Sequence, residues 1–422
     1  MTLDPEELKR RRKQKQQQRE LARKKLLLRL GLGLGIVAAV IVLIVIFSQS
    51  GGSDQEDTPP VTTEPPTSQA SDAATQPQEK TTVIHFTAAG DLNINEQVVA
   101  SGGSGYDYTG AFLDVAALLA DADVATVNLE GNLCGAPYGS SASAPQTMMQ
   151  ALSSAGVDLI QLANSYSINR GISGLRTTID SVRQAGMEPV GVWADQSSYD
   201  ESGGFTLLNI QGVKIAVVAF TKGMDGTTLP PGSESCVNVL YSDYDSTYQK
   251  VNTEKITQVL DAVARETPDI TIALLHWGSE FNDTVSRTQE TICNLMLEKG
   301  VDAIIGTHPH YVQQVKFDED AGTLVAYSLG DFFGDAQRAG SEYSILLDIE
   351  ITKNNETGQT SITDYSYTPL FTVAEENKPL RVVRIHEAMA AYEAGYIDRV
   401  SKETYDDMAY ALKRIEARVA GN

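Results

Sequence analysis

The sequence predicts an α/β fold in which mixed β-sheets are flanked by helices, preceded by one transmembrane helix. Short apolar runs of strand length alternate with amphipathic helical stretches from residue 82 onward, which is typical of a largely parallel sheet. An earlier run of eighteen residues, Leu30–Phe47, carries no charge. Together with Leu26–Leu28 it is long enough to cross a bilayer as a helix.

The N-terminal charge pattern predicts the orientation of this helix. Residues 1–29 contain eleven Lys/Arg and four Asp/Glu, so the positive-inside rule keeps the N-terminus in the cytoplasm. A cleaved signal peptide is the alternative, but its apolar core is shorter, roughly 7–15 residues, and FSQSGGS is a poor cleavage site. We therefore expect a basic cytoplasmic tail (1–25), a transmembrane helix (26–47) and a single-pass protein of the cell membrane whose main domain is extracellular.

Residues 48–81 form the next predicted unit, a disordered linker. They contain five prolines and only one large aliphatic residue, Val61. Such a segment cannot bury enough apolar surface to offset its ordering entropy. We expect it to hold the folded domain away from the membrane.

Charge and cysteine content exclude several classes of protein. After residue 29 the chain has 22 basic and 51 acidic residues, a balance of −29, which argues against nucleic acid as a partner. The three cysteines, Cys134, Cys236 and Cys293, are too few for a disulfide scaffold. They could form one disulfide with one thiol left over, or all stay free.

The elements of the predicted main domain (82–373) follow in order. The strands that we expect to be buried on both faces are Val83–Gly90, Asp123–Glu130, Val157–Asn164, Ile270–Gly278 and Val301–His308. The helical stretches between them are Thr109–Ala122, Ser173–Gly186, Glu254–Glu266 and Thr288–Gly300. Hairpins are predicted around Gln211–Gly212, around Glu319–Gly322 and within 341–370, so the sheets are mixed. A helical segment (374–422) closes the chain, with Met408, Leu412, Ile415 and Val419 on one face.

Polar residues stand where the predicted strands end. They are Asp91, Asn128, Glu130, Asn164, His276, His308 and His310. In open α/β sheets, ligands collect at the carboxyl ends of strands, so these residues should converge. The chain has only five histidines, and three of them are in this set. Imidazoles combined with carboxylates favour metals such as Zn, Mn, Fe or Ni.

The same residues carry a resemblance to a known family. The motifs G-D (90–91), N-L-E (128–130), L-A-N (162–164), H-W-G-S-E (276–280), G-T-H-P-H (306–310) and Y-S-L-G-D-F (327–332) occur in order. This pattern resembles the poly-γ-glutamate capsule biosynthesis proteins of CapA type, relatives of the calcineurin-like metallophosphoesterases. The resemblance implies a calcineurin-like metallophosphatase sandwich. It also implies one or two divalent ions (Mn, Zn or Fe) held by Asp91, Glu130, His276, His308 and His310.

One motif departs from the family pattern N-N-H-x-x-D. This chain has Asn164, Ser165 and Tyr166 at the first three positions and Asn169 at the last. The resemblance makes Asn164 and Tyr166 the candidate catalytic residues. A tyrosine with an ordinary pKa near 10 can donate a proton but is a poor base at neutral pH. Whether the chain is an enzyme is therefore left open by the sequence.

The resemblance implies a membrane-anchored protein in the synthesis or export of poly-γ-glutamate capsule or another envelope polymer. Its expected partners are the anionic polymer or the synthesis machinery, and the membrane through the N-terminal helix. Two alternatives stay open at this point. One is an active metal-dependent phosphoesterase or hydrolase on an envelope substrate, in which a metal-activated water attacks the ester. The other is a non-catalytic polymer-binding scaffold, from which a sensor of the same fold cannot be separated by sequence.

Overall fold

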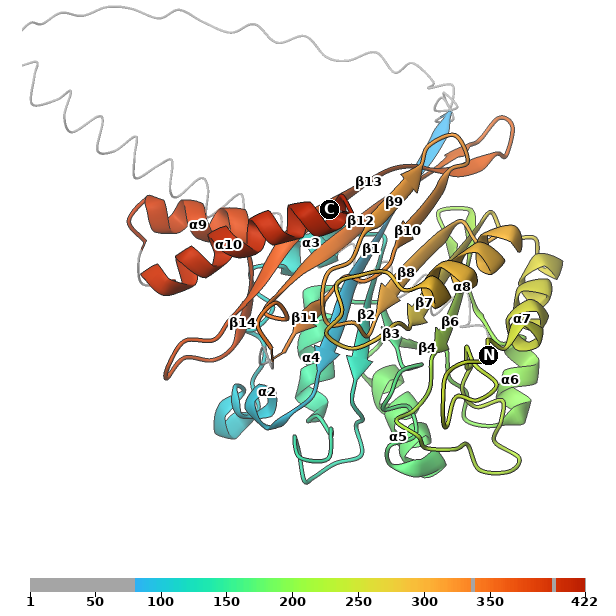
Figure 1. Cartoon of the computed structure of the whole chain (residues 1–422), viewed down its shortest axis with the longest axis horizontal. Coiled ribbons are helices and arrows are strands. Elements are labelled where there is room, and N and C mark those ends of the chain that lie inside the picture. Colours follow the sequence, from blue (N-terminus) through green and yellow to red (C-terminus); the bar gives the residue numbers. More distant parts are fainter. Residues whose placement is uncertain (1–79, 335–337, 397–399, 422) are drawn as a thin grey trace, which may run out of the picture. The chain divides into compact units, whose positions relative to one another are not determined.

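The computed structural model describes residues 80–334, 338–396 and 400–421 (Figure 1). The predicted basic tail (1–25), transmembrane helix (26–47) and linker up to residue 79 lie outside the described residues. Across the residues that are described, no helix has both the length and the apolar composition needed to cross a membrane.

Two mixed β-sheets form the centre of the described part of the chain. The larger has eight strands in the order β14-β13-β12-β1-β2-β3-β4, with β11 also paired to β1. Its strands are β1 (Thr81–Asn93), β2 (Val124–Glu130), β3 (Leu159–Gln161), β4 (Glu188–Val190), β11 (Asp331–Phe333), β12 (Tyr343–Asn354), β13 (Thr360–Val373) and β14 (Arg381–Arg384). From β1 to β4 the strands are parallel, whereas β12, β13 and β14 are antiparallel.

The smaller sheet has six strands in the order β5-β6-β7-β8-β10-β9. Its strands are β5 (Thr206–Ile210), β6 (Val213–Thr221), β7 (Ile270–His276), β8 (Ala303–Thr307), β9 (Val315–Asp318) and β10 (Thr323–Ala326). The strands β6, β7, β8 and β10 are parallel, and β5 and β9 are antiparallel edges. The three predicted hairpins are thereby confirmed as β5–β6, β9–β10 and β12–β13.

Helices flank both sheets (Figure 1). They are α2 (Glu96–Ala100), α3 (Ala116–Asp121), α4 (Gln146–Ala155), α5 (Gly171–Gln184), α6 (Gln196–Ser202), α7 (Thr253–Arg265), α8 (Arg287–Glu298), α9 (Ile385–Glu393) and α10 (Lys402–Val419), with a short 3₁₀ turn at Gly103–Gly105. The helix α8 begins with a capping box between Ser286 and Gln289, which satisfies free backbone N–H groups of its first turn.

The alternation of side chains along β6 separates two hydrophobic cores. Val213, Ile215 and Val217 join the core shared by the two sheets. Val218 and Phe220 point the other way, into the core beneath α7 and α8. Both faces of this strand are thus buried from Ile215 to Thr221.

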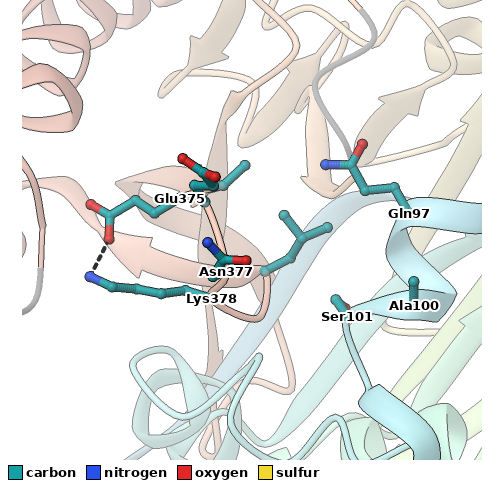
Figure 2. Close-up of a pocket in the computed structure, with 9 residues that line it drawn as sticks. Gln97, Ala100, Ser101, Glu375, Asn377 and Lys378 are labelled. Atoms are coloured by element: carbon teal, nitrogen blue, oxygen red, sulfur yellow. Dashed lines mark hydrogen bonds and ion pairs between the residues drawn. The ribbon is translucent and has the colours of Figure 1, made fainter.

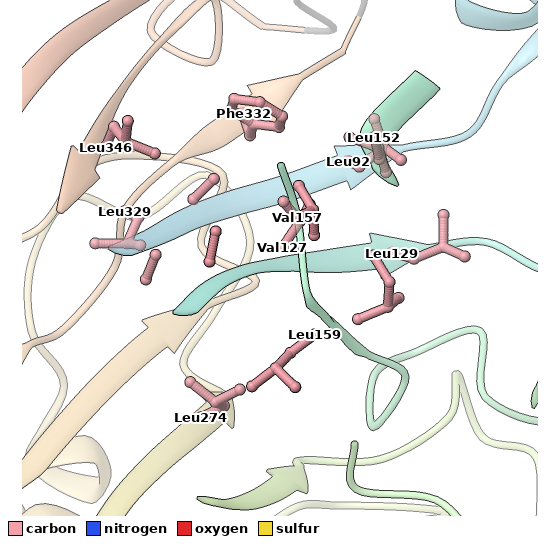
Figure 3. Close-up of a cluster of buried hydrophobic side chains, with 14 of the residues drawn as sticks. Leu92, Val127, Leu129, Leu152, Val157, Leu159, Leu274, Leu329, Phe332 and Leu346 are labelled. Carbon is pink, nitrogen blue, oxygen red and sulfur yellow. The ribbon is translucent and has the colours of Figure 1, made fainter. Parts of the chain in front are cut away.

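The core between the sheets draws leucines and valines from many elements (Figure 3). Val127 and Leu129 come from β2, Leu159 from β3 and Leu274 from β7, each nearly inaccessible to solvent. Because this core ends where the strands end, it fixes the relative positions of the residues that follow them.

The C-terminal segment (374–422) differs in one respect from the expected helical segment. It contains the helices α9 and α10, but also β14, which pairs with β13 at the edge of the larger sheet. The helix α10 contacts β12 and β13, with Met408, Ile415 and Val419 buried on the predicted face.

Candidate functional site

The strand ends of both sheets bring the predicted polar residues together. Asp91 and Glu130 come from β1 and β2 of the larger sheet. His276 ends β7, and His308 and His310 follow β8 in the smaller sheet. All five are buried.

These side chains form three overlapping groups whose possible ligand atoms lie within 4.8 Å of one another. The groups are Glu130–His276–His308, Asp91–His310–Asp331 and Glu280–His308–His310. Each of the five residues predicted as metal ligands belongs to at least one group. The convergence that the strand-end pattern predicts is therefore present, while metal binding itself stays a prediction.

A strained turn aims the two histidines of the G-T-H-P-H motif. His308 and His310 have φ of 92° and 59°, a left-handed conformation that residues other than glycine rarely adopt. The backbone N–H of His308 donates to Asp91 Oδ2 at 2.9 Å, which fixes the turn against β1. Strain of this kind persists only where the surroundings enforce it, and it concentrates at functional sites.

Buried carboxyl groups dominate the electrostatics of the site. Asp91 Oδ1 accepts a hydrogen bond from Asn128 Nδ2 at 2.5 Å. Burial nevertheless raises the pKa of Asp91 to about 6. Burial, reinforced by the charge of Asp91, also raises the pKa of Glu130 well above its usual range. A nearby cation would offset the cost of burying these two carboxyl groups in their ionised form.

Asp331 is a member of the site that the sequence analysis did not select. It lies opposite Asp91 because β11 pairs in parallel with β1. Its Oδ1 lies 2.8 Å from His310 Nδ1. Burial acts to lower the pKa of His310, but the charges of Asp331 and Glu130 outweigh it and raise that pKa to about 11. Its position in the Y-S-L-G-D-F motif (327–332) was the available signal.

The other two histidines are neutral. Burial, reinforced by neighbouring positive groups, lowers the pKa of His276 and that of His308 well below the usual value. The 3.3 Å contact between His276 Nε2 and Glu130 Oε1 therefore involves an uncharged imidazole. A neutral imidazole is the form that ligates metals.

The residues present fit a divalent cation. Glu130 Oε1 is buried and accepts no hydrogen bond from the described residues. A buried acceptor of this kind is free to bind a cation. Asp91, Glu130, His276, His308, His310 and Asp331 would hold the ion or ions. A bound ion would act there as a Lewis acid toward an anionic oxygen.

Asn164, Ser165 and Tyr166 lie beside the metal-ligand residues. Asn164 Nδ2 donates to Asn128 Oδ1 at 3.0 Å and to the Leu129 carbonyl at 2.6 Å. Its side chain thus positions the end of β2, and its catalytic role stays a prediction. Ser165 Oγ, at the second position of the N-N-H-x-x-D pattern, lies 3.2 Å from His276 Nε2.

Tyr166 retains its proton under any ordinary condition. Burial first, and then the charge of Glu130, raise its pKa to about 12. The phenol can donate a hydrogen bond or a proton but cannot serve as a base near neutral pH.

Lys222 is a second residue that the sequence analysis missed. It directly follows β6, and its Nζ lies 3.2 Å from His308 Nε2. It lies beyond the hairpin predicted around Gln211–Gly212, and the strand-end pattern consists of carboxylates, amides and imidazoles, which excludes lysine. The signal was its position one residue after a buried strand.

A surface pocket of about 420 Å³ lies apart from these groups, between α2 and the β13–β14 loop (Figure 2). Gln97, Ala100 and Ser101 line one side, and the ion pair between Glu375 and Lys378 lies on the other. Glu375 also accepts from the backbone N–H of Ser401. None of the pocket's lining residues belongs to the metal-ligand groups found in the described chain.

The three cysteines form no disulfide. Cys134, Cys236 and Cys293 are free thiols, the last two buried. Burial raises the pKa of Cys236 and of Cys293, which keeps both protonated. The sequence had left the disulfide and free-thiol states open.

Several known proteins resemble this chain. A capsule biosynthesis protein CapA of Bacillus anthracis is 27% identical over 216 residues, covering 50% of this chain and 48% of that protein. A PGA biosynthesis protein CapA of Bacillus subtilis is 26% identical over 209 residues, with coverage of 49% and 50%. A probable polyglutamine synthesis accessory protein of Mycobacterium tuberculosis is 22% identical over 191 residues. The matches span about half the length of these relatives.

Solved structures are similar only distantly. A novel phosphatase of Mycoplasma pneumoniae aligns with a TM-score of 0.40 at 15% identity, covering 68% of this chain and 94% of that one. A hypothetical protein of Thermus thermophilus gives a TM-score of 0.40 at 14% identity, with coverage of 68% and 99%.

The match to a family model covers the whole candidate site. Residues 85–336 match the family described as bacterial capsule synthesis protein PGA_cap, and this range runs from β1 past β11. The predicted resemblance to capsule proteins of CapA type, within the calcineurin-like metallophosphoesterase superfamily, is confirmed by this match and by the CapA relatives. The chain belongs to the PGA_cap family of bacterial capsule synthesis proteins.

Proposed function

We propose that this protein is a membrane-anchored, extracellular CapA-type component in the synthesis or export of poly-γ-glutamate capsule or a related envelope polymer. The observation that carries the proposal is the buried convergence of Asp91, Glu130, His276, His308 and His310 within the region that matches the PGA_cap family. The names of the two CapA relatives, which refer to capsule and PGA biosynthesis, supply the substrate class.

The anchor and the extracellular location rest on the N-terminal sequence. A basic segment precedes an uncharged run of eighteen residues, and an acidic, proline-rich stretch follows it. This order suits a domain held outside the membrane on a spacer. The partners would be the membrane and the polymer-synthesis machinery.

The charge of the chain after residue 29, linker included, restricts how it would handle the polymer. A balance of −29 after residue 29 repels a polyanion. Binding of polyglutamate therefore needs a local basic pocket or a cation between the chain and the polymer carboxylates. The buried metal-ligand groups offer one place for such a cation.

Catalysis in this proposal is weak or lost. Tyr166 stays protonated, and Ser165 presents a hydroxyl, which is a poorer metal ligand than an amide oxygen. The alternative, an active metal-dependent phosphoesterase, is favoured by one observation, the complete set of carboxylate and histidine ligands.

A deletion experiment tests the proposal. Removing the gene from the cells that make this protein should abolish surface-bound polyglutamate, and the wild-type chain should restore it. The variant His308→Ala/His310→Ala should reach the membrane fraction and fail to restore it. His386→Ala is the matched control because His386 is exposed and belongs to none of the three groups. Normal polymer in the deletion strain would refute the proposal.

A reversion experiment separates the two views of catalysis. The triple variant Ser165→Asn/Tyr166→His/Asn169→Asp rebuilds the family motif. Loaded with Mn²⁺, it should hydrolyse a generic phosphodiester about 10²–10⁴ times faster than the wild type, the usual contribution of a general acid–base group. A wild-type chain that already turns over as fast as the triple variant would favour the phosphoesterase.

A further inference from the structure

A second surface pocket, of about 400 Å³, is bounded by α6, α7 and the loop that joins β6 to α7. Tyr199, Leu229, Val239 and Tyr244 contribute apolar groups to its lining. None of its lining residues belongs to the three metal-ligand groups of the described chain. This pocket is therefore a separate feature of the molecule, with its own chemistry.

Lys255 is the cationic residue of this lining. It is half-buried, and its Nζ donates to the Tyr199 hydroxyl oxygen at 2.6 Å and lies 4.0 Å from the centre of the same ring. It forms no ion pair with any carboxylate in the described part of the chain. Several other lysines do form such pairs, namely Lys214, Lys299, Lys353, Lys378 and Lys402.

An ammonium group that is partly desolvated and has no counter-ion is an unusual arrangement, because burying a charge is costly unless the charge is paired. Burial lowers the pKa of Lys255 to about 8, so the side chain is still largely charged at neutral pH. A negatively charged group bound in the pocket would supply the missing partner.

Ser235 is a second polar residue of the lining that lacks a partner. The residue is 7% exposed, and its Oγ is buried with no hydrogen-bond partner in the described chain. Nearly all buried polar groups are paired, so this hydroxyl also indicates a missing partner. Asn252, which caps the N-terminus of α7, lines the same pocket, and the dipole of this helix favours negative charge at that end.

The charges around the pocket favour one carboxylate over a more highly charged anion. Glu234 is the acidic residue of the described lining, and it is exposed. Four further acidic residues adjoin lining residues in the sequence: Asp200, Asp243, Asp245 and Glu254. A phosphoryl group, with roughly 1.5 to 2 negative charges, would pair with one ammonium and be repelled by these residues. A carboxylate on an aliphatic body matches one ammonium, one hydroxyl and apolar walls.

We propose that this pocket binds a carboxylate group, carried by a small organic acid or by a glutamyl residue of the polymer, with Lys255 as its main partner and Ser235 as a second donor. Carboxylate binding here is independent of the proposed function, and only the glutamyl source rests on it. The pocket offers the acidic chain a basic group at which a polymer carboxylate could be held without a metal ion.

Equilibrium binding to the purified full-length chain tests the inference. The chain is first stripped of metal ions and then freed of the chelator, and binding is followed by ligand-observed NMR. The probes are butyrate, its neutral amide butyramide, and inorganic phosphate. We expect butyrate to bind about tenfold or more tightly than butyramide, because a charge-assisted hydrogen bond contributes more than a neutral one, and to bind more tightly than phosphate.

Three variants locate the bound probe. Lys255→Met should weaken butyrate binding about tenfold or more. Ser242→Trp should also weaken it, because Ser242 is exposed in the lining and a large ring there would fill the pocket while keeping the lysine. Lys378→Met is the matched control: Lys378 lines the pocket of about 420 Å³ but is already paired with Glu375 (Figure 2). It should leave butyrate binding unchanged, and circular dichroism confirms that each variant is folded.

Several results would overturn the inference. Absence of saturable butyrate binding would do so, as would butyramide binding as tightly as butyrate, and both are measured on the wild type alone. Unchanged butyrate affinity in folded Lys255→Met or in folded Ser242→Trp would place the anion elsewhere.

Two further probes identify the source of the carboxylate. Tighter binding of a γ-linked glutamate oligomer than of free glutamate would support the polymer, and the reverse would support a small acid. The polymer phenotype of the deletion strain is read separately, so the proposed function and carboxylate binding can fail independently.

Discussion

Substituting Gly90 by alanine should both destabilise the fold and damage the metal site. Gly90 precedes Asp91 at the end of β1, where the chain passes directly against Gly330. A Cβ at this position would overlap the Gly330 carbonyl oxygen and lie 3.3 Å from the Leu329 Cβ. The overlapped atom is backbone, so no side-chain rotation can relieve the clash.

The magnitude follows from what must move. The Asp91 N–H donates to the same Gly330 oxygen at 3.1 Å, and separating the strands breaks this bond. Overpacking a rigid region costs about 1–3 kcal/mol. A buried N–H left without its acceptor costs about 1–3 kcal/mol more. Gly90→Ala should therefore lower the free energy of unfolding by about 2–6 kcal/mol.

Urea denaturation of the metal-free chain measures the first effect, and Mn²⁺ titration measures the second. Because Asp91 moves with Gly90, Mn²⁺ affinity should fall about tenfold or more, as when a residue that orients a metal ligand is lost. Gly110→Ala is the control, because a Cβ at Gly110 meets nothing within 4 Å. Its free energy of unfolding should change by less than about 0.5 kcal/mol. Equal stability and equal affinity of the two variants would refute the reasoning.

Three other predictions concern charge and metal. His85 pairs with Asp348 at 2.8 Å, which raises the pKa of His85. The stabilisation from this pair is complete below the unfolded-state pKa of about 6.5 and is lost as pH rises through the folded-state pKa. His85→Gln should therefore lower the free energy of unfolding more at about pH 5.5 than at about pH 9. A difference in unfolding free energy between wild type and variant that does not change with pH would contradict this. Arg418 and Arg414 both pair with Asp283, but only Arg418 is buried. Arg418→Met should cost about 1–3 kcal/mol in urea denaturation and Arg414→Met less than about 1 kcal/mol, whereas equal costs would show that burial is irrelevant there. Saturating Mn²⁺ at about 100 times its dissociation constant should stabilise the chain by about 2.7 kcal/mol over the chelated protein, and an unchanged Tm would argue against binding.

The local part of the fold could be predicted because buried parallel strands have a simple signature. An unbroken apolar run such as that of β7 cannot lie on a solvated face, and the polar residue that ends it must then stand at the sheet edge. The pattern predicts that His276 and Glu130 converge, and the structure places His276 Nε2 3.3 Å from Glu130 Oε1 although the two residues are far apart in the sequence. The sequence therefore predicts which strand-end residues form the site.

Long-range pairing is what the sequence could not show. Asp331 joins the site because the three-residue strand β11 pairs with β1; so short a strand has no periodicity to detect, and only the Y-S-L-G-D-F motif pointed to it. β14 was not predicted either, because its four residues are too few to show a strand pattern and form a strand only by pairing with β13. Lys222 was missed for a different reason: its neighbours predict a hairpin correctly but say nothing about where the next side chain points.

The position of the site between the two sheets gives a bound ion a consequence that does not depend on turnover. Asp91 and Glu130 end strands of the larger sheet, whereas His276 and His308 follow strands of the smaller one. Without an ion, the His308 N–H to Asp91 hydrogen bond and the His276–Glu130 contact link these ends directly. Any ion that takes ligands from both sheets adds its binding free energy to the stability of the sandwich, because the unfolded chain lacks the site. Metal ligands placed in this way would therefore have a physical role without turnover, and the stability of the metal-loaded chain measures that role without a substrate.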